Sequence, residues 1–158
     1  QRHRLTTDRD DDFNIFNQKE IADTVNSISK VITLLLGSIA GISLFVGGIG
    51  IMNIMLVSVT ERTREIGIRM AVGAQPGDIK LQFLIEAITL SLFGGLIGVL
   101  CGVGASRFVG VVADFQAVVS TGSILLSFGV SFAIGVFFGY YPARKAAALD
   151  PIDALRYE

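Results

Sequence analysis

The residues whose types and spacing suit chemistry lie in one short charged block, residues 58–74. Within nine residues it holds five charged side chains, Glu61, Arg62, Arg64, Glu65 and Arg69. Long apolar runs flank the block on both sides. These side chains suit binding to a partner through charge rather than conversion of a substrate. We expect a partner outside the apolar regions to contact the block.

Patterns for catalysis and metal binding are otherwise missing from the sequence. It has no Gly-x-x-x-x-Gly-Lys-Ser/Thr phosphate loop, so we do not expect this chain itself to bind ATP. His3 is the only histidine, and no Ser/His/Asp set occurs. The acidic cluster at 8–12 could hold Ca²⁺, but it lacks the glycine and final glutamate of a calcium loop, which favours a solvated loop. We expect no catalytic residue, cofactor or metal ion here.

Three apolar runs indicate the architecture. Residues 31–59, 87–106 and 115–143 contain no Asp, Glu, Lys, Arg or His over 29, 20 and 29 residues. About 20 apolar residues suffice for a helix to cross the hydrocarbon layer of ~30 Å. A chain of 158 residues could not enclose three such helices in polar structure. The sequence therefore predicts an all-α membrane protein with three transmembrane helices.

The first predicted helix is longer than a membrane span. Asn17 followed three residues later by Glu20 has the form of a helix start, and no proline occurs from there to Thr60. A helix over 18–59 would be ~60 Å long, so its first part would stand outside the bilayer as a stalk that can carry displacement. Residues 13–16 before it resemble the last strand of a soluble domain.

Lysine and arginine in short loops predict the orientation. One side of the membrane would carry seven of them, which are Arg62, Arg64, Arg69, Lys80, Arg144, Lys145 and Arg156. The other side would carry three, which are Lys19, Lys30 and Arg107. We therefore expect the charged block and the C-terminus to be cytoplasmic. An extracytoplasmic N-terminal segment with three spans predicts a further span upstream.

Glycines four residues apart predict close helix contacts inside the membrane, although glycine is also simply common in membrane helices. The sets are Gly37 and Gly41, then Gly94, Gly98 and Gly102, then Gly135 and Gly139. These faces could contact the other spans or a second copy of the chain. Asn53 is expected to hydrogen-bond between helices. Glu86 lies just inside the second span, where a carboxylate must pair or face water. A structural partner such as Arg69 or Lys80 is expected rather than a role in proton relay.

The charged block is expected to form a short amphipathic helix. Thr60 or Thr63 can cap its start, and Ile66, Met70 and Gly73 share one face. Two interpretations stay open from these residues alone. The helix could lie on the lipid surface, or it could dock on a partner.

Four stretches of the chain resemble FtsX-like ABC transporter permeases, in particular the MacB (macrolide export) type. The main one is Val-Thr-Glu-Arg-Thr-Arg-Glu-Ile-Gly-Ile-Arg-Met-Ala-Val-Gly-Ala over 59–74. Residues 47–56, 82–86 and 141–158 fit the same family, and the resemblance covers about residues 13–158. It implies four spans with a large extracytoplasmic domain between the first and second, of which this chain would hold the last three spans.

The resemblance implies a mechanical role. Two permease copies would form a dimer, opened and closed by ATP and Mg on cytoplasmic nucleotide-binding domains. Segment 63–74 would be the coupling helix that docks on the ATPase. The implied ATPase contacts are Glu61, Arg62, Arg64, Glu65, Ile66, Arg69 and Met70. A last short helix over 150–157, capped by Asp150, would be purely structural or a further ATPase contact.

The implied function is the permease part of a MacB-type transporter of the bacterial inner membrane. It would export drugs, other small molecules or peptides, with a periplasmic adaptor and an outer-membrane duct as further partners and no nucleic acid. The alternative is an FtsX-type or lipoprotein-releasing permease that acts on an extracytoplasmic partner. The substrate, and whether the ATPase is fused or separate, stay open.

The expected divisions of the chain follow the predicted spans. They are the end of the extracytoplasmic domain at 1–17, stalk and span at 18–59, coupling helix at 60–75, second span at 76–109, extracytoplasmic loop at 110–120, third span at 121–143 and cytoplasmic tail at 144–158.

Overall fold

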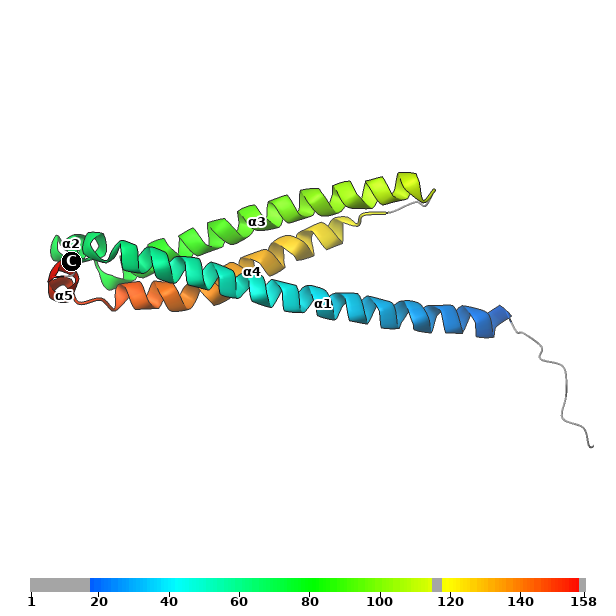
Figure 1. The fold of residues 1–158 in the computed structure, drawn as a ribbon, viewed down its shortest axis with the longest axis horizontal. Helices are drawn as coiled ribbons and strands as arrows, with labels where there is room; N and C mark the ends of the chain where they lie inside the picture. The colour runs from blue at the N-terminus through cyan, green and yellow to red at the C-terminus, as the bar shows by residue number, and fades with distance from the viewer. Residues whose placement is uncertain (1–17, 115–117, 157–158) are drawn as a thin grey trace, which may run out of the picture. The chain divides into compact units, whose positions relative to one another are not determined.

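The computed structural model describes residues 18–114 and 118–156, and every regular element in those ranges is a helix (Figure 1). The helices are α1 (Gln18–Glu61), α2 (Thr63–Ala71), α3 (Pro76–Val112), α4 (Thr121–Ala147) and α5 (Pro151–Arg156). Helices α1, α3 and α4 are each long and apolar enough to cross a membrane. The prediction of an all-α membrane protein with three spans is thus confirmed. The expected strand, acidic cluster and Asn17 cap lie outside the described residues.

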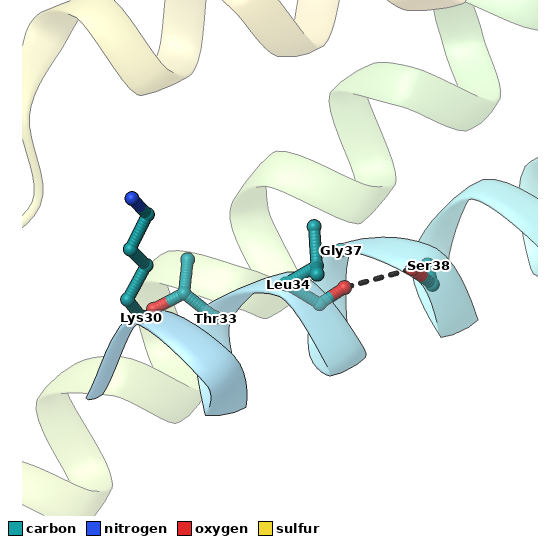
Figure 2. Close-up of a pocket in the computed structure, with 5 residues that line it drawn as sticks. All are labelled: Lys30, Thr33, Leu34, Gly37 and Ser38. Atoms are coloured by element: carbon teal, nitrogen blue, oxygen red, sulfur yellow. Dashed lines mark hydrogen bonds between the residues drawn. The ribbon is translucent and has the colours of Figure 1, made fainter. Parts of the chain in front are cut away.

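The chain divides into two compact units, residues 1–41 and 42–158. In the first unit the described part is the start of α1, whose residues are exposed. Figure 2 shows an open pocket on this helix, lined by Lys30, Thr33, Leu34, Gly37 and Ser38. The Ser38 hydroxyl donates to the Leu34 carbonyl at 2.8 Å. Because all five residues come from one helix, the pocket is a feature of the α1 surface.

In the second unit α3 and α4 run antiparallel and pack side by side (Figure 1). Gly135 and Gly139 allow this close approach. A Cβ atom built on Gly135 would lie 2.8 Å from the Cα of Ile88, and one on Gly139 would collide with the Cβ of Ala87. Both glycines are buried. The two helices therefore meet almost backbone to backbone.

A hydrogen bond strengthens this contact further along the helices. The Ser91 hydroxyl of α3 donates to the backbone carbonyl of Ser131 in α4. Beside it, a Cβ on Gly95 would collide with the Ser131 side chain. A hydroxyl in an apolar layer needs a partner, and the neighbouring helix supplies it.

The buried core of the second unit lies where four helices meet. Its members are Met55 and Val59 from α1, Ile66 from α2, Ile79, Phe83 and Ala87 from α3, and Ala143 and Ala146 from α4. Farther along α1, Gly48 is covered by the ring of Phe138 from α4. That ring also meets Phe45 edge to face, with centroids 5.5 Å apart. Burial of these apolar groups fixes the end of α1 and α2 against the α3–α4 pair.

The other glycine sets have no neighbour within the described part of the chain. A Cβ atom on Gly37, Gly41, Gly94, Gly98 or Gly102 would meet no atom within 4 Å. Asn53 is exposed as well. Their contacts with another helix or a second copy stay predictions.

Candidate functional site

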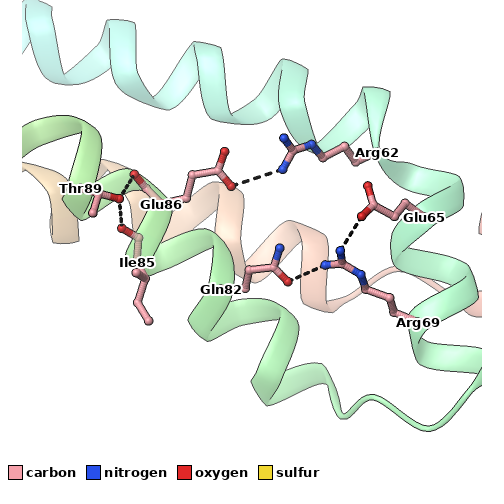
Figure 3. A network of polar contacts seen from close by, with 7 residues as sticks. All are labelled: Arg62, Glu65, Arg69, Gln82, Ile85, Glu86 and Thr89. Atoms are coloured by element: carbon pink, nitrogen blue, oxygen red, sulfur yellow. Dashed lines mark hydrogen bonds and ion pairs between the residues drawn. The ribbon is translucent and has the colours of Figure 1, made fainter.

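The charged block forms an elbow between α1 and α2, with Arg62 at the bend (Figure 3). Backbone hydrogen bonds continue through it. The Arg62 N–H donates to the Ser58 carbonyl at 3.0 Å, and the Ile66 N–H donates to the Arg62 carbonyl at 2.9 Å. The two helices are therefore joined by a bend rather than by a loose loop.

The threonines near the bend act differently from the expected cap. The Thr63 hydroxyl donates to the carbonyls of Val59 and Thr60 at 3.0 and 2.9 Å, and the Thr60 hydroxyl donates to Val57 at 2.7 Å. These hydroxyls satisfy carbonyls at the end of α1 instead of N–H groups at the start of α2. Carbonyls without a partner occur at every helix end, and here the bend exposes them to a hydroxyl one turn later.

Helix α2 buries one face and exposes the other. Ile66 is 2% exposed, and Met70 is half-buried against the same core. The structure thus places these two predicted ATPase contacts in the chain's own core, because α1, α3 and α4 together cover their apolar face. The exposed side carries Arg64, Glu65 and Arg69, together with Ile68, which the sequence reasoning did not single out. Glu61 at the end of α1 and Val72 directly after α2 are exposed as well.

Two arginines tie the elbow to α3 (Figure 3). The Arg69 guanidinium donates to Gln82 Oε1 at 2.7 Å and also to Glu65. Arg62 forms an ion pair with Glu86 at 3.5 Å. The expected partner of Glu86, Arg69 or Lys80, is therefore wrong. The bend brings Arg62 over α3, while Arg69 is held by Glu65 and Gln82.

The C-terminal helix α5 packs on the back of α2. Ala154 is buried, and a Cβ on Gly67 would lie 2.7 Å from the Ala154 Cβ. Asp150 Oδ1 accepts the Ile152 N–H at 2.9 Å, so Asp150 does cap this helix. Sequence reasoning missed Gly67. The signal that could have found it is a glycine in the interior of a nine-residue helix. Such a glycine makes the helix less stable by about 1 kcal/mol than alanine would, so its presence indicates a close contact.

The sequence of the chain is similar to those of known membrane proteins. The family model FtsX-like permease C-terminal matches residues 37–151. The chain is 57% identical to the macrolide export ATP-binding/permease protein MacB of Bdellovibrio bacteriovorus over 159 residues, which cover all of the chain and 24% of that protein. It is 52% identical to the protein of the same name in Syntrophobacter fumaroxidans, covering all of the chain and 22% of that relative.

A shorter relative shares the same region. The uncharacterized ABC transporter permease YknZ of Bacillus subtilis is 52% identical over 149 residues, which are 94% of this chain and 38% of YknZ. The chain thus spans about a quarter of the two MacB relatives and a larger share of YknZ. Three apolar helices and these similarities make it a multi-pass membrane protein. The chain belongs to the FtsX-like permease family and corresponds to the C-terminal membrane region of its MacB-type members.

Proposed function

We propose that the exposed face of α2 is the site where an ABC ATPase docks, and that α1 carries the ATP-driven motion toward the extracytoplasmic side. The observation that carries this proposal is that α2 buries its inner face and exposes its outer face. Its inner face is held by the core through Ile66 and by α5 through Gly67. A push on the outer face therefore acts on all the helices that meet in this core.

The same burial favours docking over a helix that lies on lipid. A lipid-lying helix turns a continuous apolar face toward the acyl chains, but here Ile66 and Met70 face the core. The outer face has a small apolar centre, Ile68 and Val72, with Arg64 and Glu65 beside it. An apolar centre with a polar rim is typical of a protein interface.

The distribution of charge supports a cytoplasmic place for the elbow. In the second unit, six cations lie on α2, at the bend, at the start of α3 or at the end of α4. They are Arg62, Arg64, Arg69, Lys80, Arg144 and Lys145. The opposite end of α3 has only Arg107. Positive charge marks the cytoplasmic side of short loops, so we place the elbow and α5 in the cytoplasm of a bacterial cell, with the spans in its inner membrane.

The names of the relatives support export as the purpose of this motion. Two of them are named for macrolide export, and we propose that the whole transporter exports drugs or similar small molecules or peptides. Two permease copies would form the dimer, with the uncovered glycine faces available for that contact. A periplasmic adaptor and an outer-membrane duct would complete the path. The relatives include proteins named ATP-binding/permease and one named permease, so the ATPase could be fused or separate.

Cysteine crosslinking tests the docking face. In a Cys101→Ser background, Ile68→Cys should crosslink to the ATPase domain, because residue 68 is 42% exposed on the outer face. Ile66→Cys is the matched control on the same helix, and it should not crosslink because residue 66 is buried. Equal yields at both positions, or a crosslink only at 66, would show that α2 meets the ATPase in a different orientation from the one proposed.

A further inference from the structure

Among the described residues, three cations where α3 begins and α4 ends form no ion pair with a carboxylate. The ion pairs among the described residues involve only Arg62 and Arg69. Lys80 on α3 and Arg144 and Lys145 in the last turn of α4 form none of them, and both α4 cations are exposed. Their charge is therefore available to an anion.

Two carboxylates that lie within five residues of these cations in the sequence accept backbone N–H groups. Asp78 Oδ2 accepts the Gln75 N–H at 3.0 Å at the start of α3. Asp150 Oδ1 accepts the Ile152 N–H at the start of α5. Each caps a helix N-terminus, where the helix dipole also stabilises its charge. Neither carboxylate forms an ion pair with the three cations.

Two tyrosines share this surface with the cations. The Lys80 ammonium lies 4.5 Å from the centroid of the Tyr140 ring, a cation–π arrangement that bridges α3 and α4. Arg144 follows Tyr140 by one helical turn, and Lys145 follows Tyr141 by one turn, so each cation shares a face of α4 with a tyrosine. Both tyrosines are exposed. We call these five residues the basic–aromatic patch.

The patch lies where two membrane spans end. The run of α4 without charge ends at Ala143, and Arg144 and Lys145 follow at once. Tyrosine is enriched at the level of the lipid headgroups, and lysine and arginine near a span attract anionic lipids. We propose that the basic–aromatic patch binds the phosphate headgroup of an anionic phospholipid, with Tyr140 holding Lys80 in place.

A lipid is favoured over an acidic surface of the ATPase because the patch belongs to α3 and α4 rather than to α2. The patch tyrosines are partly apolar and suit the boundary between headgroups and acyl chains. The proposal requires only that α3 and α4 span a membrane, so its failure and the failure of the docking proposal are separate results.

Fluorescence quenching measures the lipid preference. The chain contains no tryptophan, so Tyr141→Trp gives a single reporter at the patch, and Phe108→Trp gives one at the opposite end of α3. The chain would be reconstituted in mixtures of phosphatidylcholine and phosphatidylglycerol, with one or the other lipid brominated. Brominated phosphatidylglycerol should quench the reporter at 141 more strongly than brominated phosphatidylcholine, and the preference at 108 should be weaker.

Variants in the background of the 141 reporter assign the preference to the patch. Arg144→Gln with Lys145→Gln should lower it by about fivefold for each charge removed. Tyr140→Leu should lower it by displacing Lys80, while Tyr140→Phe should keep it because the ring remains. Arg64→Gln, which removes one exposed charge at the same end of the second unit, is the control for a single charge and should leave it unchanged. Equal quenching by the two lipids at 141, or a preference that survives the double variant, would overturn the proposal. So would a double variant that loses ATPase binding with its lipid preference intact.

Discussion

The glycines at the contact between α3 and α4 and those on the outer surface of α3 have different surroundings. At the contact, Gly135 and Gly139 of α4 lie against Ala87 and Ile88 of α3, and a Cβ on either glycine would collide with α3. Away from it, Gly94, Gly98 and Gly102 have the same four-residue spacing, are exposed, and would meet no atom within 4 Å. The pattern alone thus indicates that backbones can approach closely, while the rotation of each helix decides whether a neighbour of the same chain is there.

Replacement of a glycine at the contact between α3 and α4 should lower the free energy of unfolding more than any other change described below. In Gly135→Ala the new Cβ would lie 2.8 Å from the Ile88 Cα and 3.2 Å from the Ala87 carbonyl oxygen. Backbone atoms cannot turn away, so α3 and α4 must separate, at a cost of about 1–3 kcal/mol. The free energy of unfolding in mixed detergent micelles, followed by circular dichroism, measures the loss.

Gly98→Ala is the matched control for that variant. Its Cβ would meet no described atom within 4 Å. The free energy of unfolding should therefore not fall, and it should rise by up to about 1 kcal/mol because alanine favours a helix over glycine. If Gly98→Ala destabilises the chain as much as Gly135→Ala, the distinction between a filled and an open glycine face is wrong.

Gly67 extends the comparison to the contact between α2 and α5. In Gly67→Ala the Cβ would lie 2.7 Å from the Ala154 Cβ, but α5 has six residues and can move away more easily than α3 or α4. The expected loss is about 1 kcal/mol or less, because alanine also favours the helix by up to about 1 kcal/mol. Hydrogen exchange reports it locally. The Ala154 amide, bonded to the Asp150 carbonyl at 2.9 Å, should exchange several-fold faster.

Gly77→Ala serves as the control for Gly67, since a Cβ at position 77 would meet no atom within 4 Å. The exchange rate at Ala154 should stay at its original value in that variant. If the Ala154 amide exchanges at the same rate in Gly67→Ala, the packing of α5 on α2 does not depend on glycine at position 67.

The ion pair between Arg62 and Glu86 should contribute least. Its side chains are 46% and 34% exposed, and exposed pairs contribute about 0–1 kcal/mol. A double-mutant cycle with Arg62→Gln and Glu86→Gln should give a coupling energy within that range, measured by the same unfolding assay. Arg64→Gln, which removes an exposed charge that forms no ion pair among the described residues, gives the baseline. A coupling energy above about 1.5 kcal/mol would contradict this. The ion pair would then stabilise the elbow by as much as the close contact at Gly135 stabilises the packing of α3 on α4.

The three spans could be predicted because they depend on composition along one stretch of chain. Each run without charge is long enough to cross the membrane whatever its neighbours are. The starts of α3 at Pro76 and of α5 at Pro151 could also be predicted from the local sequence, because proline suits the first turn of a helix.

The site was harder to predict because it depends on which face of α2 turns inward. Ile66 and Met70 form an apolar stripe that fits a partner, lipid or the chain's own core equally well, and only the packing of α1, α3 and α4 shows that the core covers it. The partner of Glu86 depended on the bend at Arg62. The contact between Gly67 and Ala154 joins residues far apart in the sequence, and no local pattern pairs them.

The hydrogen bonds through the bend at Arg62 have a mechanical consequence. A loose loop would act as a swivel and let α2 rotate without turning α1. Here the bonds from Arg62 to Ser58 and from Ile66 to Arg62, with Thr63 bridging to Val59 and Thr60, would have to break before the joint could slip. Each is worth about 0.5–1.5 kcal/mol. If an ATPase docks on α2 as proposed, a torque on this helix would be passed on as twist along the adjoining end of α1.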